Sequence, residues 1–308
     1  MSPYIAIVGS VNVDLVFRAP RLPAVGETLL GHSFQQIRGG KGANQAVAAA
    51  RLGAPVLFVG AVGDDAFGAD ARNGLNAEGI NVEHLTVIAH TATGVAGIVV
   101  QDDGDNSIVL AAGANAALST VHIDNASTSI RQARLLICQL ETPITTVTHA
   151  INIARQNGGI TILNPAPAQD LDDALLRQVD YLILNEVEAR QLSGIAVNDP
   201  HTAQDAAQIL LQRGVGAVIV TLGEQGAICC TANDQQTIAA HRVKVVDTTA
   251  AGDTFVGAFA VSLLQGLTID QACAQAQSAA AITVTRLGAQ TSIPTRAELE
   301  TFIQKNQP

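Results

Sequence analysis

The segment with the clearest chemical pattern runs from residue 247 to residue 255 and reads Asp-Thr-Thr-Ala-Ala-Gly-Asp-Thr-Phe. A strand is predicted over 241–246, followed by a helix from about Gly252 to about Gln265. The first N–H groups of a helix are unpaired and lie at the positive end of its dipole, which favours a bound anion. Asp253 beside such an anion hole could accept a hydroxyl proton during phosphoryl transfer. A carboxylate that only stabilises the first helical turn is the plainer interpretation.

A second pattern, Arg-Gly-Gly-Lys-Gly-Ala-Asn-Gln-Ala, occupies residues 38–46 and leads into an alanine-rich helix that ends at Gly53. A glycine turn into a tightly packed helix would explain the alanines. Three glycines, Lys41 and Asn44 are better explained by close approach of the backbone to a polyhydroxyl ligand. The segment is not a Walker A loop, because glycine follows Lys41, and no Gly-x-Gly-x-x-Gly motif supports a dinucleotide fold.

Residues 10–14, Ser-Val-Asn-Val-Asp, follow the first predicted strand. In an extended segment the side chains of Asn12 and Asp14, which are two residues apart, point to the same face. Together they could bind two neighbouring hydroxyl groups of a sugar. Turn chemistry explains an Asn and an Asp at this place equally well.

Polar residues also follow two later strands, at the edge where open parallel sheets bind their ligands. The segment 185–188, Asn-Glu-Val-Glu, either belongs to such a site or starts a helix with acidic first-turn residues. The segment 221–226, Thr-Leu-Gly-Glu-Gln-Gly, is either a glycine hairpin or part of a nucleotide site at the same edge.

The remaining sequence predicts a scaffold in which strands and helices alternate. Apolar residues three and four apart predict helices such as 144–155 and 203–213. Strand, helix and strand at this spacing imply parallel pairing, and hence an α/β fold with a doubly wound, mostly parallel sheet and helices on both faces. Buried strands are predicted at residues 4–9, 55–61, 135–140, 160–163, 181–184 and 217–222.

Two regions break this alternation, residues 11–38 and 93–112, because they show strand-like patterns without helices. Together they predict a small antiparallel β-sheet that forms a lid over one end of a single domain spanning residues 1–308. The acidic run 102–105 is too short for a calcium loop and lacks the terminal glutamate, so a hairpin turn is the better interpretation.

The composition of the 308-residue chain bears on its partners. The net charge of −10, the absence of tryptophan and an aromatic content of 3% argue against nucleic acid as a ligand. No apolar run approaches the ~18 residues of a membrane span, so no membrane partner is expected. Four cysteines without a Cys-x-x-Cys pair are expected to be buried, reduced thiols. With no apolar leader at the amino terminus, these features predict a cytoplasmic protein.

Taken together, the segments resemble the phosphofructokinase-B (ribokinase) family of carbohydrate kinases over essentially the whole chain. The likeness rests on the runs 39–53 and 247–255, which are similar to the two signatures of the family, and on Asn-Pro-Ala-Pro-Ala at 164–168. The resemblance implies that the γ-phosphate of ATP is transferred to O5 of D-ribose, with Mg²⁺ and a monovalent cation, K⁺, as cofactors. It also implies a homodimer that forms through the lid sheets.

The resemblance gives each matching residue a role, with Asp253 as the general base. The amides of Ala250, Ala251, Gly252 and Asp253 would form the anion hole. Sugar hydroxyls would be held by Asn12, Asp14, Gly40, Lys41, Asn44, Glu141 and Asp253. The phosphates, magnesium and nucleotide would lie at Asn185, Glu188, Thr221, Gly223, Gly226, Gly252 and Gln277, where Gln277 replaces the expected His or Asn beside the adenine. The monovalent cation would lie at Asp247, Thr249, Thr283, Arg286, Gly288 and Ser292.

Three alternatives remain at this stage. The same chemistry could act on 2-deoxyribose, on fructose or on a nucleoside such as adenosine, although Asn12, Asp14 and Asn44 favour adjacent hydroxyls. A non-catalytic sugar-binding regulator with this fold would be expected to lack the Gly252–Asp253 pair, which is present here. A nicotinamide-dependent oxidoreductase is the third alternative, but the sequence lacks the Gly-x-Gly-x-x-Gly motif that would support it.

Overall fold

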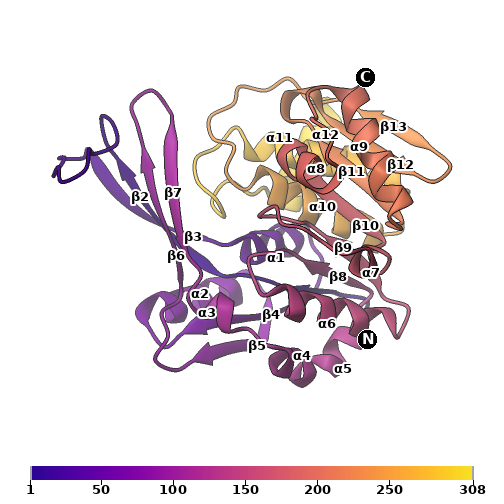
Figure 1. The fold of residues 1–308 in the computed structure, drawn as a ribbon, viewed down its shortest axis with the longest axis horizontal. Helices are drawn as coiled ribbons and strands as arrows, with labels where there is room; N and C mark the ends of the chain where they lie inside the picture. The colour runs from indigo at the N-terminus through magenta and orange to yellow at the C-terminus, as the bar shows by residue number, and fades with distance from the viewer. Residues whose placement is uncertain (1, 307–308) are drawn as a thin grey trace.

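The computed structural model describes residues 2–306, and its main body is built on a nine-stranded sheet (Figure 1). Seven adjacent strands, β11, β10, β9, β8, β1, β4 and β5, run parallel to one another. The strands β12 and β13 extend the sheet beyond β11 as antiparallel strands. In spatial order they are β13 (Gln235–Ile238), β12 (Ala227–Thr231), β11 (Ala217–Thr221), β10 (Tyr181–Asn185), β9 (Ile160–Leu163), β8 (Leu135–Cys138), β1 (Ile5–Val8), β4 (Val56–Gly63) and β5 (Asn81–Ile88).

Helices cover both faces of this sheet, so the prediction of a doubly wound fold is confirmed. Alternate residues of β1 belong to opposite cores, since Ala6 and Val8 pack in one and Ile5 and Ile7 in the other. One core contains residues of α3 (Ala114–Ala117), α4 (Thr120–Asn125), α5 (Ser127–Gln132), α6 (Ile144–Arg155), α7 (Asp173–Leu176), α8 (Glu186–Ser193) and α9 (Pro200–Gln212). The other contains residues of α1 (Lys41–Arg51), α2 (Ala66–Ala77), α10 (Ala251–Leu264), α11 (Ile269–Thr283) and α12 (Arg296–Lys305).

The two regions without helices form a separate small sheet that projects from the main body (Figure 1). Its order is β3 (Ser33–Gly39), β2 (Asn12–Arg18), β6 (Gly94–Val100) and β7 (Asn106–Ala111). The outer pairs are antiparallel, as predicted, and the central pair of β2 and β6 is parallel. The acidic run 102–105 lies in the tight turn of the β6–β7 hairpin, where Gln101 N–H donates to the Asp105 carbonyl at 2.8 Å.

The strand predicted over 241–246 is wrong, because this segment is an irregular loop. The Val246 N–H donates to the carbonyl of Val284, just after α11, at 2.7 Å, so this amide pairs with a helix end and not with another strand. Valines at this loop face a cavity instead of a sheet neighbour. The strands β5, β12 and β13 were not predicted from the sequence.

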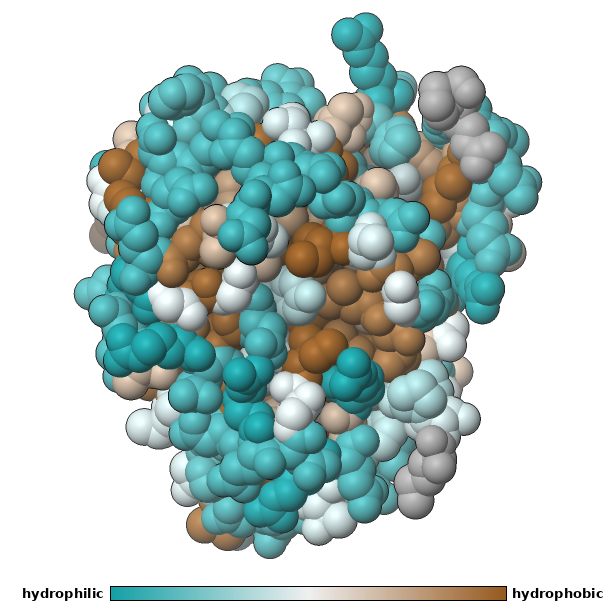
Figure 2. Space-filling model, turned by 90° about the vertical axis from the view of Figure 1, so that its right-hand side faces the viewer, coloured by the Kyte–Doolittle hydropathy of each residue, from teal (hydrophilic) through white to brown (hydrophobic). Residues whose placement is uncertain are grey.

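The surface combines few charges with many neutral polar side chains. On the side of the molecule that Figure 2 shows, hydrophilic residues cover most of the face and apolar ones gather near its middle. All four cysteines are buried and free, which confirms that prediction. Between residues 2 and 306, no helix is both long enough and apolar enough to cross a bilayer.

Candidate active site

The start of α10 presents free N–H groups where the sequence predicts an anion hole. Its N-cap Ala250 has a left-handed backbone with φ 60° and ψ 8°, which is unusual for a residue with a side chain. A left-handed residue followed by helical ones turns successive N–H groups to one side, an arrangement that binds anions. The Ala251 N–H donates to the Thr248 carbonyl at 3.2 Å. Within residues 2–306, the N–H groups of Gly252 and Asp253 have no hydrogen-bond acceptor and are free for a ligand.

Asp253 lies in the first turn of α10 and is nearly buried. Its Oδ2 accepts from Asn44 Nδ2 at 2.9 Å, and its Oδ1 accepts from Gln45 Nε2 at 3.1 Å. Both donors belong to the first turns of α1, which packs closely on α10 because Gly257 lies against Ala48. The segment 38–46 therefore holds the Asp253 carboxylate of the segment 247–255, although more than 200 residues of chain separate them.

A second carboxylate, Glu141, accepts hydrogen bonds from the segment 10–14 and from the start of α1. Its Oε2 accepts from Ser10 Oγ at 2.5 Å, from the Lys41 N–H at 3.0 Å and from Asn12 Nδ2 at 3.3 Å. The structure thus brings together three of the residues predicted to hold a sugar, from three segments distant in sequence.

Several charges share this small region, which shifts their protonation. Burial raises the pKa of Asp14 to about 6, and the nearby carboxylates of Glu141 and Asp253 add to the effect. Burial alone would lower the pKa of Lys41, but the carboxylates of Asp253, Glu141 and Glu188 more than offset it and raise that pKa. Lys41 is therefore a fully charged ammonium group among acidic side chains.

The glycines at the start of α1 have a different cause from the one that the sequence suggested. Gly40 has φ +92°, and a Cβ built on it would lie 2.6 Å from the Asn12 nitrogen. A Cβ on Gly42 would lie 2.6 Å from the Ser10 nitrogen. These glycines let the start of α1 approach the backbone of residues 9–12, and through it place Asn12 and Lys41 beside Glu141. Close approach to a ligand is not what requires them.

The segment 185–188 starts a helix and also faces the site. Asn185 caps α8 in a capping box, with its Oδ1 accepting from the Glu188 N–H at 2.9 Å and its own N–H donating to Glu188 Oε2 at 2.9 Å. Burial raises the pKa of Glu188, and the Lys41 charge acts in the opposite direction. The interpretation of this segment as a helix start is confirmed, and Asn185 and Glu188 also line the smaller cavity, where a ligand could reach them.

A cavity of about 190 Å³ lies between these groups. Its lining brings together the predicted base, the anion hole and the polar ends of the strands. The lining residues are Lys41, Asn164, Ala166, Ile183, Leu184, Asn185, Glu188, Thr221, Thr248, Ala250, Gly252, Asp253 and Val256. The other predicted sugar residues, Asn12, Asp14, Asn44 and Glu141, adjoin it through Lys41 and Asp253.

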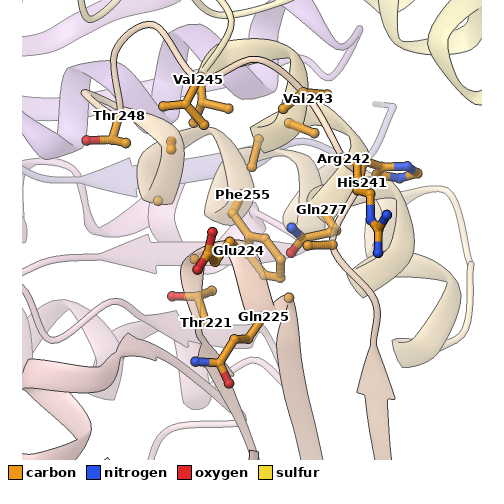
Figure 3. A pocket seen from close by; sticks show the side chains of 18 residues that line it. Thr221, Glu224, Gln225, His241, Arg242, Val243, Val245, Thr248, Phe255 and Gln277 are labelled. Atoms are coloured by element: carbon orange, nitrogen blue, oxygen red, sulfur yellow. The ribbon is translucent and has the colours of Figure 1, made fainter. Parts of the chain in front are cut away.

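A larger cavity of about 740 Å³ adjoins the first and shares Thr221, Thr248 and Gly252 with it. All five residues predicted for the nucleotide itself line it, namely Thr221, Gly223, Gly226, Gly252 and Gln277. Figure 3 shows Phe255 and Gln277 between the hairpin that joins β11 to β12 and the valines of the loop 240–245. A cavity with apolar lining residues beside the free N–H groups of a helix start suits a nucleotide.

The residues predicted for a monovalent cation lie on two loops that Asp247 joins, except for Thr283, which is the last residue of α11. Its Oδ1 accepts from the Thr249 N–H at 2.9 Å and from the Thr249 hydroxyl at 2.7 Å, and its Oδ2 accepts from the Gly288 N–H at 2.9 Å. Burial raises the pKa of Asp247, but these hydrogen bonds outweigh it and hold that pKa below its ordinary value. Asp247 is therefore a stable anion.

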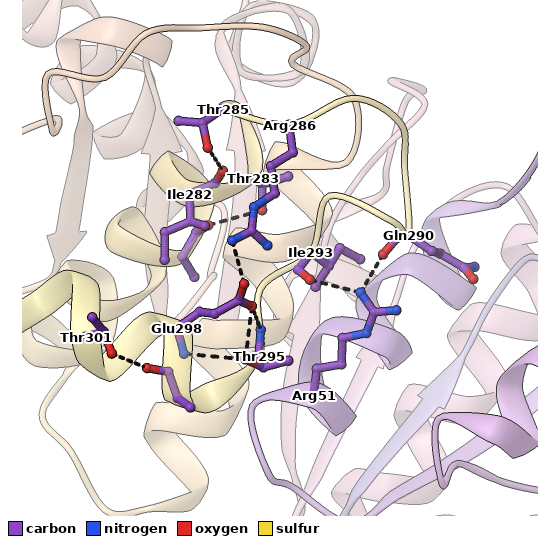
Figure 4. A network of polar contacts seen from close by, with 12 residues as sticks. Arg51, Ile282, Thr283, Thr285, Arg286, Gln290, Ile293, Thr295, Glu298 and Thr301 are labelled. Atoms are coloured by element: carbon purple, nitrogen blue, oxygen red, sulfur yellow. Dashed lines mark hydrogen bonds and ion pairs between the residues drawn. The ribbon is translucent and has the colours of Figure 1, made fainter.

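The side chains of the other predicted cation residues have partners elsewhere. The Thr283 hydroxyl oxygen lies 3.1 Å from both Thr254 Oγ1 and the Ala279 carbonyl oxygen, within hydrogen-bond distance of each, and the Ser292 hydroxyl donates to the Ala289 carbonyl at 2.7 Å. Arg286 forms an ion pair with Glu298 at 2.7 Å (Figure 4). The hydroxyl oxygens of Thr283 and Ser292 keep their lone pairs, and the backbone carbonyls are the other oxygens that these residues offer to a cation. No group of three or more His, Cys, Asp or Glu side chains in the described part of the chain is arranged so that it could hold a metal ion.

Four residues of the site were not singled out from the sequence. Gln45, Gln139 and Asn164 form a buried amide network behind Asp253, and Asn115 holds the side chain of Asn12. The only signals were positional, since Gln45 lies next to Asn44 in the second pattern and Asn164 follows a strand directly.

Comparison with known proteins identifies the family of the chain. The sequence matches the model of the pfkB family of carbohydrate kinases over residues 2–296. A ribokinase of Haemophilus influenzae is 43% identical over 304 residues, covering 99% of both chains, and a deoxyribokinase of Salmonella typhi is 38% identical, covering 98% of this chain and 99% of the other. The structure of a ribokinase of Arabidopsis thaliana complexed with ribose and ATP matches with a TM-score of 0.93 at 32% identity, covering 99% of both chains.

Proposed function

This chain belongs to the pfkB family of carbohydrate kinases, and we propose that it phosphorylates D-ribose at O5 with ATP. It is a sugar kinase, and ribokinases are among its relatives at 43% identity over nearly the full length. One observation carries the assignment of the chemistry to this site. The Asp253 carboxylate and the free N–H groups of Gly252 and Asp253 lie where the smaller cavity meets the larger one.

The proposed reaction is an in-line displacement with Asp253 as the base. The O5 hydroxyl of ribose attacks the γ-phosphorus, the bond from that phosphorus to the β–γ bridging oxygen breaks, and ADP leaves. The O5 proton passes to the Asp253 carboxylate. The free N–H groups at the start of α10 and the Lys41 ammonium stabilise the negative charge on the transferring group.

The sugar would bind between β2 and the start of α1. Asp14 and Glu141 offer acceptors, and Lys41 and Asn12 offer donors. The Oδ1 of Asn44 is buried and has no partner among the described residues, while its Nδ2 is bound to Asp253. A buried acceptor without a donor is unfavourable, and a ribose hydroxyl would satisfy it.

The small sheet would act as the lid. It carries Asn12 and Asp14 on β2, so its position decides whether the sugar residues meet the phosphate residues. Closure over the bound sugar would exclude water and limit hydrolysis of ATP.

The site fits a Mg²⁺ ion held mainly by phosphates and water, which is the usual manner for this ion. Glu188 is a nearly buried carboxylate beside the anion hole, and burial raises its pKa, so a nearby cation would favour its ionised form. Asn185 would keep Glu188 in place through the capping box. When bound with ATP, the ion would neutralise phosphate charge.

The loops around Asp247 fit a monovalent cation such as K⁺. The carboxylate is anionic, and the remaining candidates, Thr249, Thr283, Arg286, Gly288 and Ser292, would contribute chiefly backbone carbonyls. Carbonyl oxygens around one anion suit a weakly hydrated monovalent ion. The same loop leads into Ala250, so an ordered cation site would hold the anion hole in shape.

The lid sheets of two copies would form the dimer. Phe17 and Phe34 are 47% and 54% exposed, with ring centroids 4.9 Å apart, and Ile108 and Val109 on β7 are also exposed. Such a group of apolar side chains on a projecting sheet is typical of an interface.

The test is ADP production from ATP–Mg²⁺ with D-ribose, 2-deoxyribose, fructose and adenosine, each with K⁺ or Na⁺. We expect ribose to give the highest kcat/KM and K⁺ to increase it. The 38% identical deoxyribokinase makes 2-deoxyribose the main competitor, and preference for that sugar would overturn the assignment of the substrate but not the chemistry. No turnover with any sugar despite ribose binding would favour a regulator.

A further inference from the structure

A network of three buried amide side chains lies behind Asp253. Gln45 Nε2 donates to Asp253 Oδ1 at 3.1 Å and to Asn164 Oδ1 at 3.2 Å, and Gln139 Nε2 donates to Gln45 Oε1 at 2.5 Å. Gln45 and Gln139 are fully buried. Gln45 lines neither cavity, so it reaches the site only through the carboxylate that it binds.

The network leaves Gln45 one orientation. Its Oε1 is taken by Gln139, so its Nε2 has to face Asp253 and Asn164. Asn164 is itself fixed, because its Nδ2 donates to the Ile183 carbonyl at 2.9 Å and its Oδ1 therefore faces Gln45. A flip of the Gln45 amide would place oxygen against oxygen at two contacts and lose three hydrogen bonds. Gln139 after β8, Asn164 after β9 and Ile183 in β10 thus orient the Gln45 amide so that its N–H donor faces Asp253.

The charges around Asp253 explain why a neutral donor is useful there. Asp14, Glu141 and Glu188 contribute negative charge, and Lys41 is the positive side chain among them. Two amides, from Asn44 and Gln45, bind one carboxylate oxygen each and fix the plane of the group. A carboxylate has about four lone-pair positions, so others remain for a sugar hydroxyl.

A purely structural role accounts poorly for this arrangement. The network leaves Gln139 Oε1 buried without a partner in the described structure, which is a cost of about 1–3 kcal/mol that an apolar side chain would avoid. The observed polar chain ends on the Asp253 carboxylate, which lines the smaller cavity beside the free N–H groups at the start of α10.

We propose that Gln45, oriented by Gln139 and Asn164, is a positioning residue that aims the Asp253 carboxylate at the attacking hydroxyl. The inference rests on the proposed function, because it takes Asp253 as the base. Gln45 does not bind the sugar, so its loss reduces the rate of phosphoryl transfer more than the affinity for the substrate.

Two variants test this, Gln45→Met, which keeps the shape and removes the hydrogen bonds, and Gln45→Glu, which keeps the size and exchanges the donor for a carboxyl. For Gln45→Met we expect kcat to fall about 10- to 100-fold, the range of a slightly misplaced catalytic group. The KM for ribose should change less than about threefold. Thr146→Val is the matched control, since it removes a buried hydrogen bond to the Leu118 carbonyl and Thr146 lines neither cavity.

The pH profile of Gln45→Glu separates positioning from packing. An ionised carboxyl repels Asp253, whereas a protonated one donates a hydrogen bond in place of the lost amide. The ratio of its kcat to that of the parent should therefore rise at least about fivefold as the pH falls from about 8 to about 6. Asp14, Glu141, Glu188 and Lys41 titrate in both proteins, so the ratio removes their contribution.

Several results would overturn the proposal. A kcat of Gln45→Met within about twofold of the Thr146→Val control would make Gln45 a packing residue. A raised KM at unchanged kcat would make it a sugar ligand. If Gln45→Met does not fold, a pH-independent ratio for Gln45→Glu still rejects positioning. The parent enzyme decides the proposed function by itself, because failure to phosphorylate ribose appears there before any variant is compared.

Discussion

Asn115, in the short helix α3, fixes the side chain of Asn12 at the start of β2. Its Nδ2 donates both to Asn12 Oδ1 and to the Val11 carbonyl, at 2.8 and 2.9 Å, and its Oδ1 accepts from the Val11 N–H at 2.9 Å. Because Asn12 Oδ1 is occupied, Asn12 Nδ2 has to face Glu141, at 3.3 Å. The Asn12 amide is thus held with its donor toward the sugar site.

Asn115→Leu is expected to weaken ribose binding without affecting the nucleotide. The change leaves both backbone groups of Val11 without buried partners and frees Asn12 to flip. We expect the KM for ribose to rise about tenfold or more, corresponding to the loss of one to two kcal/mol of binding. The KM for ATP should stay within about twofold, since the larger cavity is distant. Equal changes in both constants would contradict a local role.

Asp253→Asn tests the base directly. The variant keeps the size of the side chain but cannot accept the O5 proton, so kcat should fall at least about 100-fold, the low end for a positioned general base. Calorimetry should still detect ribose binding, which shows that the site is intact. Near-parental turnover in this variant would exclude Asp253 as the base.

The sequence alone predicted those parts of the structure that depend on residues close together in the chain. The start of α10 and the cap of α8 depend on residues within one turn, so their patterns are visible in a short stretch. Apart from the segment 241–246, the six strands predicted for the main sheet are buried apolar runs, and each was found within two residues of its bounds. Local patterns suggested Asn12, Asp14, Lys41 and Asn44 as sugar residues, whereas Glu141 came from the resemblance alone.

The rest depends on contacts between distant segments. Gln45 and Asp253 are 208 residues apart, and nothing beside Gln45 in the sequence shows that its amide faces a carboxylate. The loop 241–246 has the composition of a strand, but its neighbour is the end of α11 and not another strand. The glycines of α1 were assigned to a ligand because their real neighbours, residues 9–12, come from a different part of the chain.

Asp14 should make the ligand-free protein less stable at neutral pH. Its pKa is about 6 in the folded protein and 3.8 as a model value, so ionisation costs the folded state up to about 3 kcal/mol above pH 6. Asp14→Asn should therefore stabilise the protein at about pH 8, and the gain should disappear as pH falls through 6 toward 4. Urea unfolding at several pH values checks this. The same variant should bind ribose more weakly, and a constant stability difference would contradict the raised pKa.

Arg51, the last residue of α1, connects this helix to the loop of the candidate cation site. Its Nη1 donates to the carbonyls of Gln290 and Ile293 at 2.6 and 2.9 Å (Figure 4), and it also pairs with Glu78. Arg51→Met should loosen the loop, so the K⁺ concentration for half-maximal activity should rise about tenfold, as for other supports of metal ligands. Arg296→Met, which removes an exposed ion pair with Glu300, is the control and should have no such effect. An unchanged K⁺ dependence in Arg51→Met would show that this loop does not support the cation site.

Gly252 and Gly257 lie in the same helix and should respond oppositely to alanine. A Cβ on Gly252 would meet no atom within 4 Å, but it would enter the space shared by the two cavities. A Cβ on Gly257 would lie 2.6 Å from the Cβ of Ala48, where α1 and α10 touch.

Gly252→Ala should therefore be as stable as the parent, or more stable by about 0.5–1 kcal/mol because alanine favours the helix. Its kcat should nevertheless fall at least about tenfold, since the methyl group occupies the place of the transferring phosphoryl group. Gly257→Ala should lose stability by about 1–3 kcal/mol through overpacking. Thermal unfolding and ADP production on both variants decide the matter. Full activity of Gly252→Ala would show that the phosphoryl group does not approach the start of α10, because a methyl group and a phosphate oxygen cannot share that position.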